Sequence, residues 1–175
     1  MSEIHPSAVV SKEAELAEDV TVGPNTIIEG NVVIGSGSCI ASNALIASGA
    51  RLGKGVKVHH GAVIGTTPQD LKFGGEESTA EIGDNTVVRE YATINRGTVD
   101  RGKTVIGSEC LLMAYSHVAH DCLIGDHCIL ANSVNLAGHI EIGEWAILGG
   151  VLPVHQFVKI GDHAMIGGGF RVPLD

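Results

Sequence analysis

The residues with the clearest capacity for chemistry lie together in the segment HVAHDC, residues 117–122. His120 can accept a proton near neutral pH, and the adjacent Asp121 can orient the imidazole and stabilise the imidazolium that forms. Clustered imidazoles are also common zinc ligands. Proton transfer and metal binding are therefore the two candidate chemistries, and the elements that position this segment must be worked out to compare them.

These elements follow from a repeat of six residues. An aliphatic residue recurs at every sixth position from Ile4 to Ile64, from Ile82 to Ile94 and from Ile106 to Val172. The fifth place of each hexad is mostly small or β-branched, and the fourth is often Asn or Gly, which tolerate a left-handed backbone at a corner. Short strands and corners that turn in one sense, three to a coil, predict a triangular parallel β-helix with about 18 residues per coil.

Composition agrees with a narrow prism. The 175 residues suffice for one domain, and 44% are hydrophobic although only 3% are aromatic, so Ile, Val, Leu and Ala must fill the core. We therefore predict an all-β fold, with the first and fifth places of each hexad pointing inward. The polar segments 70–81 and 100–105 lack this inward pair and are predicted to be loops that project from the prism.

Charge and cysteine usage narrow the class of protein. The net charge is −9 without a block of like charges, which argues against nucleic-acid partners and anionic membrane surfaces. No signal segment and no long apolar run is present, so we expect a cytoplasmic protein without membrane insertion. Cys110, Cys122 and Cys128 occupy the inward fifth place and are expected to be free thiols of the core.

The coil length converts sequence into approximate geometry around His120. Residues 18 apart share a column, so His120, Gly138 and Gln156 are predicted to stack on successive coils. Gly138 offers an unshielded backbone N–H that can donate to an oxyanion, and a base beside such a donor suggests acyl transfer. The expected polar patch, about 10 Å tall from two strand spacings, contains His117, His120, Asp121, His139, His155 and Gln156.

Several longer motifs resemble one family. TTPQDLKFGGE, INRGT, SHVAHDC, CILAN, LAGH, LGG and VHQF are similar to motifs of the UDP-N-acetylglucosamine O-acyltransferases of lipid A biosynthesis, from about residue 4 to the last residue. The resemblance implies a homotrimer of left-handed β-helices that moves an (R)-3-hydroxyacyl chain from acyl carrier protein to the glucosamine 3-position of a UDP-sugar. The site would lie between subunits. We expect one β-helix domain over residues 1–175, with the family's C-terminal helical domain absent or truncated.

The resemblance also implies roles for individual residues. His120 would be the general base, Asp121 its partner and Gly138 the source of the oxyanion N–H. Gly168 would lie where the family measures acyl length, leaving room for a long chain. Asn95 stands where some members carry histidine and is expected to influence whether the acceptor is UDP-N-acetylglucosamine or its 3-amino analogue. The remaining residues expected to bind the sugar nucleotide are Asp70, Lys72, His117, His139, His155 and Gln156.

Two other functions remain open from the sequence. A zinc enzyme like the trimeric β-helix carbonic anhydrases is one, but these use a His-x-x-x-x-His pair, and position 122, five residues after His117, is cysteine. We therefore expect no metal and no other cofactor. A non-catalytic prism that binds only the UDP-sugar or acyl carrier protein is the other. Zinc content and binding without turnover separate these alternatives from acyl transfer.

Overall fold

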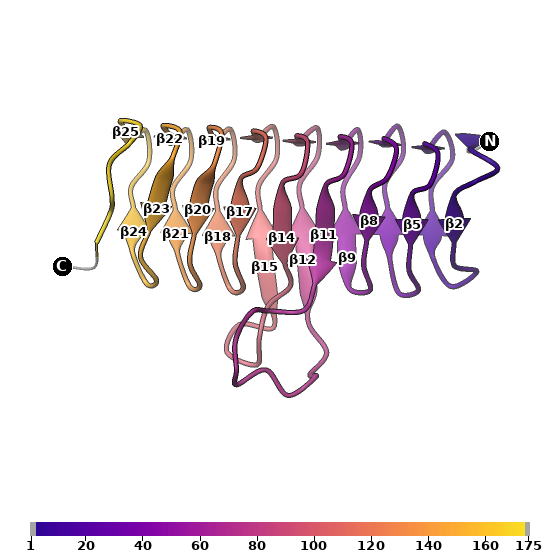
Figure 1. The fold of residues 1–175 in the computed structure, drawn as a ribbon, viewed down its shortest axis with the longest axis horizontal. Helices are drawn as coiled ribbons and strands as arrows, with labels where there is room; N and C mark the ends of the chain where they lie inside the picture. Colours follow the sequence, from indigo (N-terminus) through magenta and orange to yellow (C-terminus); the bar gives the residue numbers. More distant parts are fainter. Residues whose placement is uncertain (1–2, 174–175) are drawn as a thin grey trace.

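The computed structural model describes residues 3–173 and shows an elongated prism with the two ends of the chain at opposite ends of the long axis (Figure 1). Within these residues the strands form three parallel sheets of nine, eight and eight strands, which we call sheets A, B and C. Successive strands pass from sheet A to B to C, so each coil contributes one strand to each sheet. This is the parallel β-helix that the hexads predict. No helix is present among residues 3–173, and hence none that could span a lipid bilayer.

The strands are short, with two to four residues each. Sheet A contains β1 (Glu3–Ile4), β4 (Thr21–Val22), β7 (Cys39–Ile40), β10 (Lys57–Val58), β13 (Val87–Val88), β16 (Leu111–Leu112), β19 (Ile129–Leu130), β22 (Ile147–Leu148) and β25 (Met165–Ile166). Sheet B contains β2 (Val9–Val10), β5 (Ile27–Ile28), β8 (Leu45–Ile46), β11 (Val63–Thr66), β14 (Thr93–Asn95), β17 (His117–Val118), β20 (Val134–Leu136) and β23 (Leu152–Val154). Sheet C contains β3 (Glu15–Leu16), β6 (Val33–Ile34), β9 (Ala50–Leu52), β12 (Thr79–Ile82), β15 (Lys103–Ile106), β18 (Leu123–Ile124), β21 (Glu141–Ile142) and β24 (Lys159–Ile160).

The register between coils gives the coil length directly. Glu3 pairs with Thr21, 18 residues later, as the hexads predict. The offset rises to 30 between Lys57 and Val87 and to 24 between Val87 and Leu111. The excess over 18 is therefore 12 residues in the first coil and six in the second, and these residues form the two loops.

Both loops leave the prism at the corner between sheets B and C and project to the same side (Figure 1). The first joins β11 to β12 over residues 67–78, and the second joins β14 to β15 over residues 96–102. Each loop begins before the predicted start and ends before the predicted end of its segment, which were 70–81 and 100–105. The predicted boundaries are therefore corrected to 67–78 and 96–102. Because each insertion is a multiple of six, the hexad phase is the same before and after it, and phase cannot locate the inserted residues.

The first and fifth places of the hexads form the core. Ile64 and Ile94, at first places, are at most 1% exposed, and the fifth-place residues Cys110, Cys122 and Cys128 are at most 2% exposed. All three cysteines are free thiols, as predicted. Burial raises the pKa of the Cys122 thiol to about 12, which makes it a small apolar core residue instead of a nucleophile.

The fourth place of the hexads forms the corners. Asn25, Asn31 and Asn43 have φ between 52° and 56° there, in the left-handed region that Asn tolerates better than most residues. The same conformation occurs at Asp121, with φ of 60°, and at His139, with φ of 63°. Two residues of the candidate site therefore lie at strained backbone positions of the corner between sheets B and C.

Candidate active site

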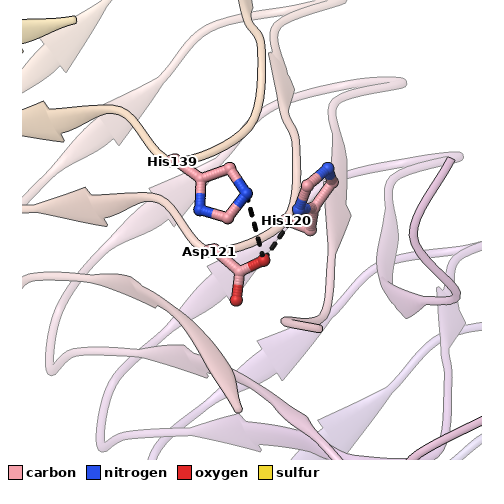
Figure 2. A group of neighbouring side chains, drawn as sticks. All are labelled: His120, Asp121 and His139. Atoms are coloured by element: carbon pink, nitrogen blue, oxygen red, sulfur yellow. Dashed lines mark hydrogen bonds and ion pairs between the residues drawn. The ribbon is translucent and has the colours of Figure 1, made fainter. Parts of the chain in front are cut away.

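The corner after β17 positions the two central residues of the candidate site. His117 is the outward residue of β17, and the chain then turns through 119–121 before β18 begins at Leu123. His120 and Asp121 are consecutive in this turn, and His120 Nδ1 lies 2.7 Å from Asp121 Oδ2 (Figure 2). The His120 side chain is 13% exposed and that of Asp121 is fully buried. The imidazole therefore lies between a buried carboxylate and the surface.

Both oxygens of the Asp121 carboxylate accept hydrogen bonds. Oδ1 accepts from the backbone N–H groups of Thr98 at 3.0 Å and Arg101 at 3.2 Å, both in the loop 96–102. Oδ2 accepts from the Thr98 hydroxyl at 2.7 Å as well as from His120. The backbone N–H of Asp121 in turn donates to the hydroxyl of the buried Thr104 at 2.9 Å. The carboxylate is thus fixed by the loop and by the histidine, and the backbone of Asp121 is fixed by β15.

These contacts determine the protonation of the pair. Burial alone would raise the pKa of Asp121, but hydrogen bonds from His120 and Thr98 outweigh it, and the pKa lies below its ordinary value. Asp121 is therefore ionised at neutral pH and can only accept hydrogen bonds. Consequently His120 carries its proton on Nδ1 and leaves the lone pair of Nε2 free to act as a base.

Gly138 packs directly against the His120 imidazole from the next coil. A Cβ atom on residue 138 would lie 2.6 Å from His120 Cε1 and 2.7 Å from Nε2, too close for any side chain. The Gly138 carbonyl accepts a hydrogen bond from the N–H of Phe157 on the following coil at 3.2 Å. Glycine at 138 is therefore required by the packing of His120, in addition to the predicted role as an oxyanion donor.

The Gly138 N–H is free to bind an oxyanion. Within residues 3–173 it donates to no protein acceptor. The N–H groups at the same hexad place of Lys54, Ser108 and Glu144 each donate to an aspartate carboxylate from the next coil at 2.7–2.9 Å. The residue 18 positions after Gly138 is the neutral Gln156 instead of an aspartate, so no carboxylate at that place of the column takes the Gly138 N–H.

His139 forms the second side of the candidate site. Its ring lies edge-on to His120, with centroids 5.1 Å apart, and stacks on Phe157 at 4.6 Å. His139 Nε2 is 3.9 Å from Asp121 Oδ2 (Figure 2) and 3.7 Å from Asp100 Oδ2. These distances exceed a direct hydrogen bond, so His139 contributes an available donor or acceptor near the base.

The loop 67–78 brings Asp70 to the same corner. Asp70 Oδ2 lies 4.0 Å from His120 Nε2, which places a carboxylate next to the free nitrogen of the base. Asp70 Oδ1 accepts the backbone N–H of Lys72 at 2.9 Å, so the two residues form a local turn. The Lys72 side chain itself is exposed. The structure thus brings the predicted residue Asp70 to the site and places Lys72 beside it.

His117 and Asn95 lie on the outer face of sheet B near this corner. His117 Nδ1 is 2.7 Å from the Thr93 hydroxyl, and burial followed by the nearby His120 lowers the pKa of His117, which favours the neutral imidazole. Asn95 is only 3% exposed and donates through Nδ2 to Thr66 Oγ1 at 3.0 Å and to the Thr67 carbonyl at 3.2 Å. Asn95 therefore ties the starts of the two loops together.

The remaining predicted residues lie further along the prism. His155 and Gln156 are exposed at the corner between sheets B and C, one coil beyond Gly138, and border a pocket of about 430 Å³ with Arg171. Gly168 lies at the corner between sheets A and B, where it packs against the Gly150 carbonyl. In a single chain Gly168 and His120 are therefore on different corners and do not share one site.

His120, Asp121 and His139 also have the residue types of a metal site. One ligand atom each from His120, Asp121 and His139 lies within 4.8 Å of the others. However, both carboxylate oxygens of Asp121 already accept two hydrogen bonds each. A metal ion would have to displace the His120–Asp121 hydrogen bond, so the donor set fits an acid–base pair better than a metal centre.

Sequence reasoning missed the residues that cover Asp121. Thr98 and Arg101 bind its carboxylate, and Asp100 faces His139, yet the hexads predict an open corner at position 121. The sequence feature that could have revealed these contacts is the predicted loop, because residues inserted at this corner can cover Asp121. Thr98 was present in the INRGT motif, but periodicity assigns no contact to a residue outside the repeat.

Comparison with known proteins agrees with this geometry. The family model of the bacterial transferase hexapeptide (six repeats) matches residues 13–48 and 103–138. An acyl-[acyl-carrier-protein]–UDP-N-acetylglucosamine O-acyltransferase of Chlorobaculum parvum is 57% identical over 123 residues, which are 70% of this chain and 47% of the relative. The crystal structure of a UDP-N-acetylglucosamine acyltransferase from Bacteroides fragilis superposes with a TM-score of 0.95 at 50% identity, over 97% of this chain and 66% of that one.

A further solved structure decides the family. The UDP-N-acetylglucosamine acyltransferase from Campylobacter jejuni superposes with a TM-score of 0.94 at 41% identity, over 99% of this chain and 68% of that one. The chain belongs to the UDP-N-acetylglucosamine O-acyltransferase family. Membership confirms that the parallel β-helix is left-handed. The chain spans about half the length of the curated O-acyltransferases that it matches.

Proposed function

We propose that this chain provides the acyl-transfer site of a UDP-N-acetylglucosamine O-acyltransferase. In this reaction an (R)-3-hydroxyacyl chain moves from acyl carrier protein to the glucosamine 3-position of UDP-N-acetylglucosamine, which is a step of lipid A synthesis. The observation that carries the proposal is the 2.7 Å contact between His120 Nδ1 and the buried, ionised Asp121. It leaves Nε2 as a base in a family whose relatives carry this activity in their names.

The chemical steps follow from the geometry of this chain. His120 Nε2 removes the proton of the acceptor hydroxyl as its oxygen attacks the thioester carbonyl carbon. A carbon–oxygen bond forms, and the Gly138 N–H stabilises the negative charge on the former carbonyl oxygen. When this intermediate collapses, the carbon–sulfur bond breaks and the thiolate takes the proton from the His120 imidazolium. Asp121 stabilises that imidazolium throughout and holds the ring in one tautomer.

The sugar nucleotide is assigned to the groups around this pair. Asp70 and His139 flank His120 at 4.0 Å and at a ring-centroid distance of 5.1 Å, where they can bind the hydroxyls and amide of the glucosamine. His117 lies on the adjacent face of sheet B, and Lys72 extends from the loop 67–78. His155 and Gln156 border the next pocket along the corner and would bind more distant parts of the nucleotide.

The positions of His120 and Gly168 support a site shared between subunits. The proposed acyl ruler Gly168 is on the corner between sheets A and B, and His120 is on the corner between sheets B and C. In a homotrimer, the corner of one subunit that carries Gly168 would lie beside the corner of the neighbouring subunit that carries His120. Acyl carrier protein as the donor and the cytoplasm as the location complete the proposal.

Acyl-transfer assays with His120→Ala test the function. With (R)-3-hydroxyacyl carrier protein and UDP-N-acetylglucosamine, we expect turnover by the parental chain and a loss of at least about 100-fold in the variant, the usual scale for a general base. His163→Ala, which changes an exposed histidine at the corner between sheets C and A, is the matched control and should keep parental turnover. His120→Ala with near-parental turnover would exclude His120 as the base.

The same preparation separates the alternatives. Tight binding of UDP-N-acetylglucosamine without turnover by the parental chain would support a non-catalytic prism. Stoichiometric zinc in the purified protein, lost on His139→Ala, would support the metal site instead. Acyl transfer that persists after treatment with a chelator would refute the metal alternative.

A further inference from the structure

The loop 96–102 covers Asp121 more completely than the residues at the same place of the next two coils, where the side chain of His139 is 12% exposed. Phe157, at the same hexad place in the same column, is 53% exposed, whereas Asp121 is fully buried. The difference comes from this loop, which folds over Asp121 and supplies three of the four hydrogen bonds to its carboxylate. The insertion therefore has a specific effect on the proposed acid–base pair.

Thr98 makes two of these three hydrogen bonds and is itself only 5% exposed. Its N–H donates to Asp121 Oδ1 at 3.0 Å, and its hydroxyl lies 2.7 Å from Asp121 Oδ2. Each of these two donors binds one oxygen of the carboxylate, and together they fix the plane of the group. The oxygen that the Thr98 hydroxyl touches is the same one that accepts His120 Nδ1.

The direction of the Thr98 hydroxyl is determined by its second contact. The backbone N–H of Asp100 donates to Thr98 Oγ1 at 3.3 Å, and Asp121 is ionised and can only accept. The hydroxyl hydrogen must therefore point to Asp121 Oδ2. A hydrogen bond of a hydroxyl to a carboxylate is a charge-assisted one and is stronger than a bond between neutral groups.

The loop is also anchored to the wall of the prism. Arg101 forms an ion pair with Glu141 of β21, and Glu141 also contacts Lys159 of β24 at 2.9 Å. Arg101 supplies the third hydrogen bond to Asp121 through its backbone N–H. The loop thus joins sheet C to the carboxylate and holds Thr98 in place.

We propose that Thr98 is a positioning residue that holds the Asp121 carboxylate in the plane required to orient His120. This inference rests on the proposed acyl transfer for its effect on turnover. Thr98 does not touch the reacting atoms and acts through Asp121. The ionisable groups that face Asp121 are His120 in the same turn and His139 on the next coil, with Asp100 and Arg101 in the loop.

The first test compares Thr98→Val with Thr98→Ser in the full chain. Valine keeps the β-branched shape and loses the hydroxyl, and we expect kcat to fall about 10- to 100-fold, the scale of a lost hydrogen bond to a charged group, with KM nearly unchanged. Serine keeps the hydroxyl and should retain most of kcat. Equal kcat values for the two variants would overturn the proposal. If circular dichroism shows that the valine variant is unfolded, Thr98→Ala replaces it.

A double-mutant cycle separates this role from a structural one. In an Asp121→Ala background, Thr98→Val should change kcat less than about twofold, because the partner of the hydroxyl is already gone. A similar loss in both backgrounds would mean that Thr98 only supports the loop and would refute its action through Asp121.

A readout that needs no turnover keeps this inference distinct from the proposed function. The carboxyl carbon of Asp121, followed by NMR during an acid titration, should titrate at higher pH in Thr98→Val than in the parental chain, because a hydrogen bond to the ionised form is lost. An unchanged midpoint would overturn the proposal even if the parental chain is active. If the midpoint is raised but the parental chain shows no acyl transfer, the role of Thr98 at Asp121 stands and only the proposed function is refuted.

Discussion

The packing of Gly138 against His120 leads to a prediction for a single methyl group. Gly138 has no left-handed φ, so the backbone at this position accepts alanine, but the added Cβ would lie 2.6 Å from His120 Cε1. An ordinary contact needs 3.4–4 Å. The imidazole must therefore move by about 1 Å, and the short hydrogen bond to Asp121 resists that movement because both ends are held.

Gly138→Ala is expected to lower turnover strongly and to destabilise the fold moderately. A displacement of about 1 Å of a catalytic group can lower the rate by about 100-fold, whereas one extra methyl group in a packed site costs about 1–3 kcal/mol. Alanine keeps the backbone N–H at position 138, so the loss reports on the position of the imidazole and not on the oxyanion donor.

The assay for Gly138→Ala is kcat with saturating (R)-3-hydroxyacyl carrier protein and UDP-sugar, together with thermal unfolding. Gly161→Ala is a matched control, because a Cβ there meets nothing within 4 Å and the residue has no left-handed φ; it should leave kcat unchanged. Gly138→Ala that keeps more than about one third of the parental kcat would refute the reasoning, because the imidazole would then not be where the contact places it.

Two further substitutions test the carboxylate and the acceptor preference. Burial opposes ionisation of Asp121, but hydrogen bonds from His120 and Thr98 lower its pKa below the ordinary value. The ionised carboxylate therefore stabilises the fold at pH values above the unfolded pKa of about 4. This stabilisation is lost as the pH falls through the lower pKa of the folded state. The difference in unfolding free energy between the parental chain and Asp121→Asn, measured with urea, should be constant from about pH 7 to 5 and shrink below about pH 4; a difference that grows on acidification would contradict this sign. Asn95→His is expected to change the ratio of turnover with 3-hydroxyl and 3-amino UDP-sugars, and an unchanged ratio in side-by-side assays would remove Asn95 from acceptor choice.

The sequence predicts the β-helix well because the features that determine it lie within each hexad and recur in every hexad. Each hexad contains its own inward residues and its own corner, so Ile64, Ile94 and the core cysteines could be assigned without knowledge of distant contacts. The 18-residue coil then follows from three sides per turn, and the stacking of Gly138 on His120 follows from the coil. The parallel pairing observed between successive strands confirms this part of the prediction.

The loops and their contacts could not be predicted in the same way. An insertion of 12 or six residues preserves the hexad phase, so the sequence leaves open whether Thr79–Ile82 belongs to a loop or to β12. The contact of Thr98 with Asp121 depends on the path of an irregular segment that no periodicity describes. Asp121 was correctly placed at a corner, but its complete burial is a property of the loop above it.

The corner residues with left-handed φ differ in how well they would tolerate substitution by glycine. A residue other than Gly at such a φ raises the local energy by about 1–2 kcal/mol. Val151 has a φ of 55° and 67% of its surface exposed, and its apolar side chain cannot form a hydrogen bond that offsets this energy. At Asp121 and His139 the same conformation projects the side chains out of the prism toward the loops. Glycine would relax the chain at all three positions, but at Val151 it would remove only an apolar side chain that this chain leaves exposed, and at Asp121 it would remove the carboxylate of the proposed acid–base pair. Glycine at Val151 is therefore expected to raise the heat resistance of the single chain, and glycine at Asp121 to abolish the proposed chemistry.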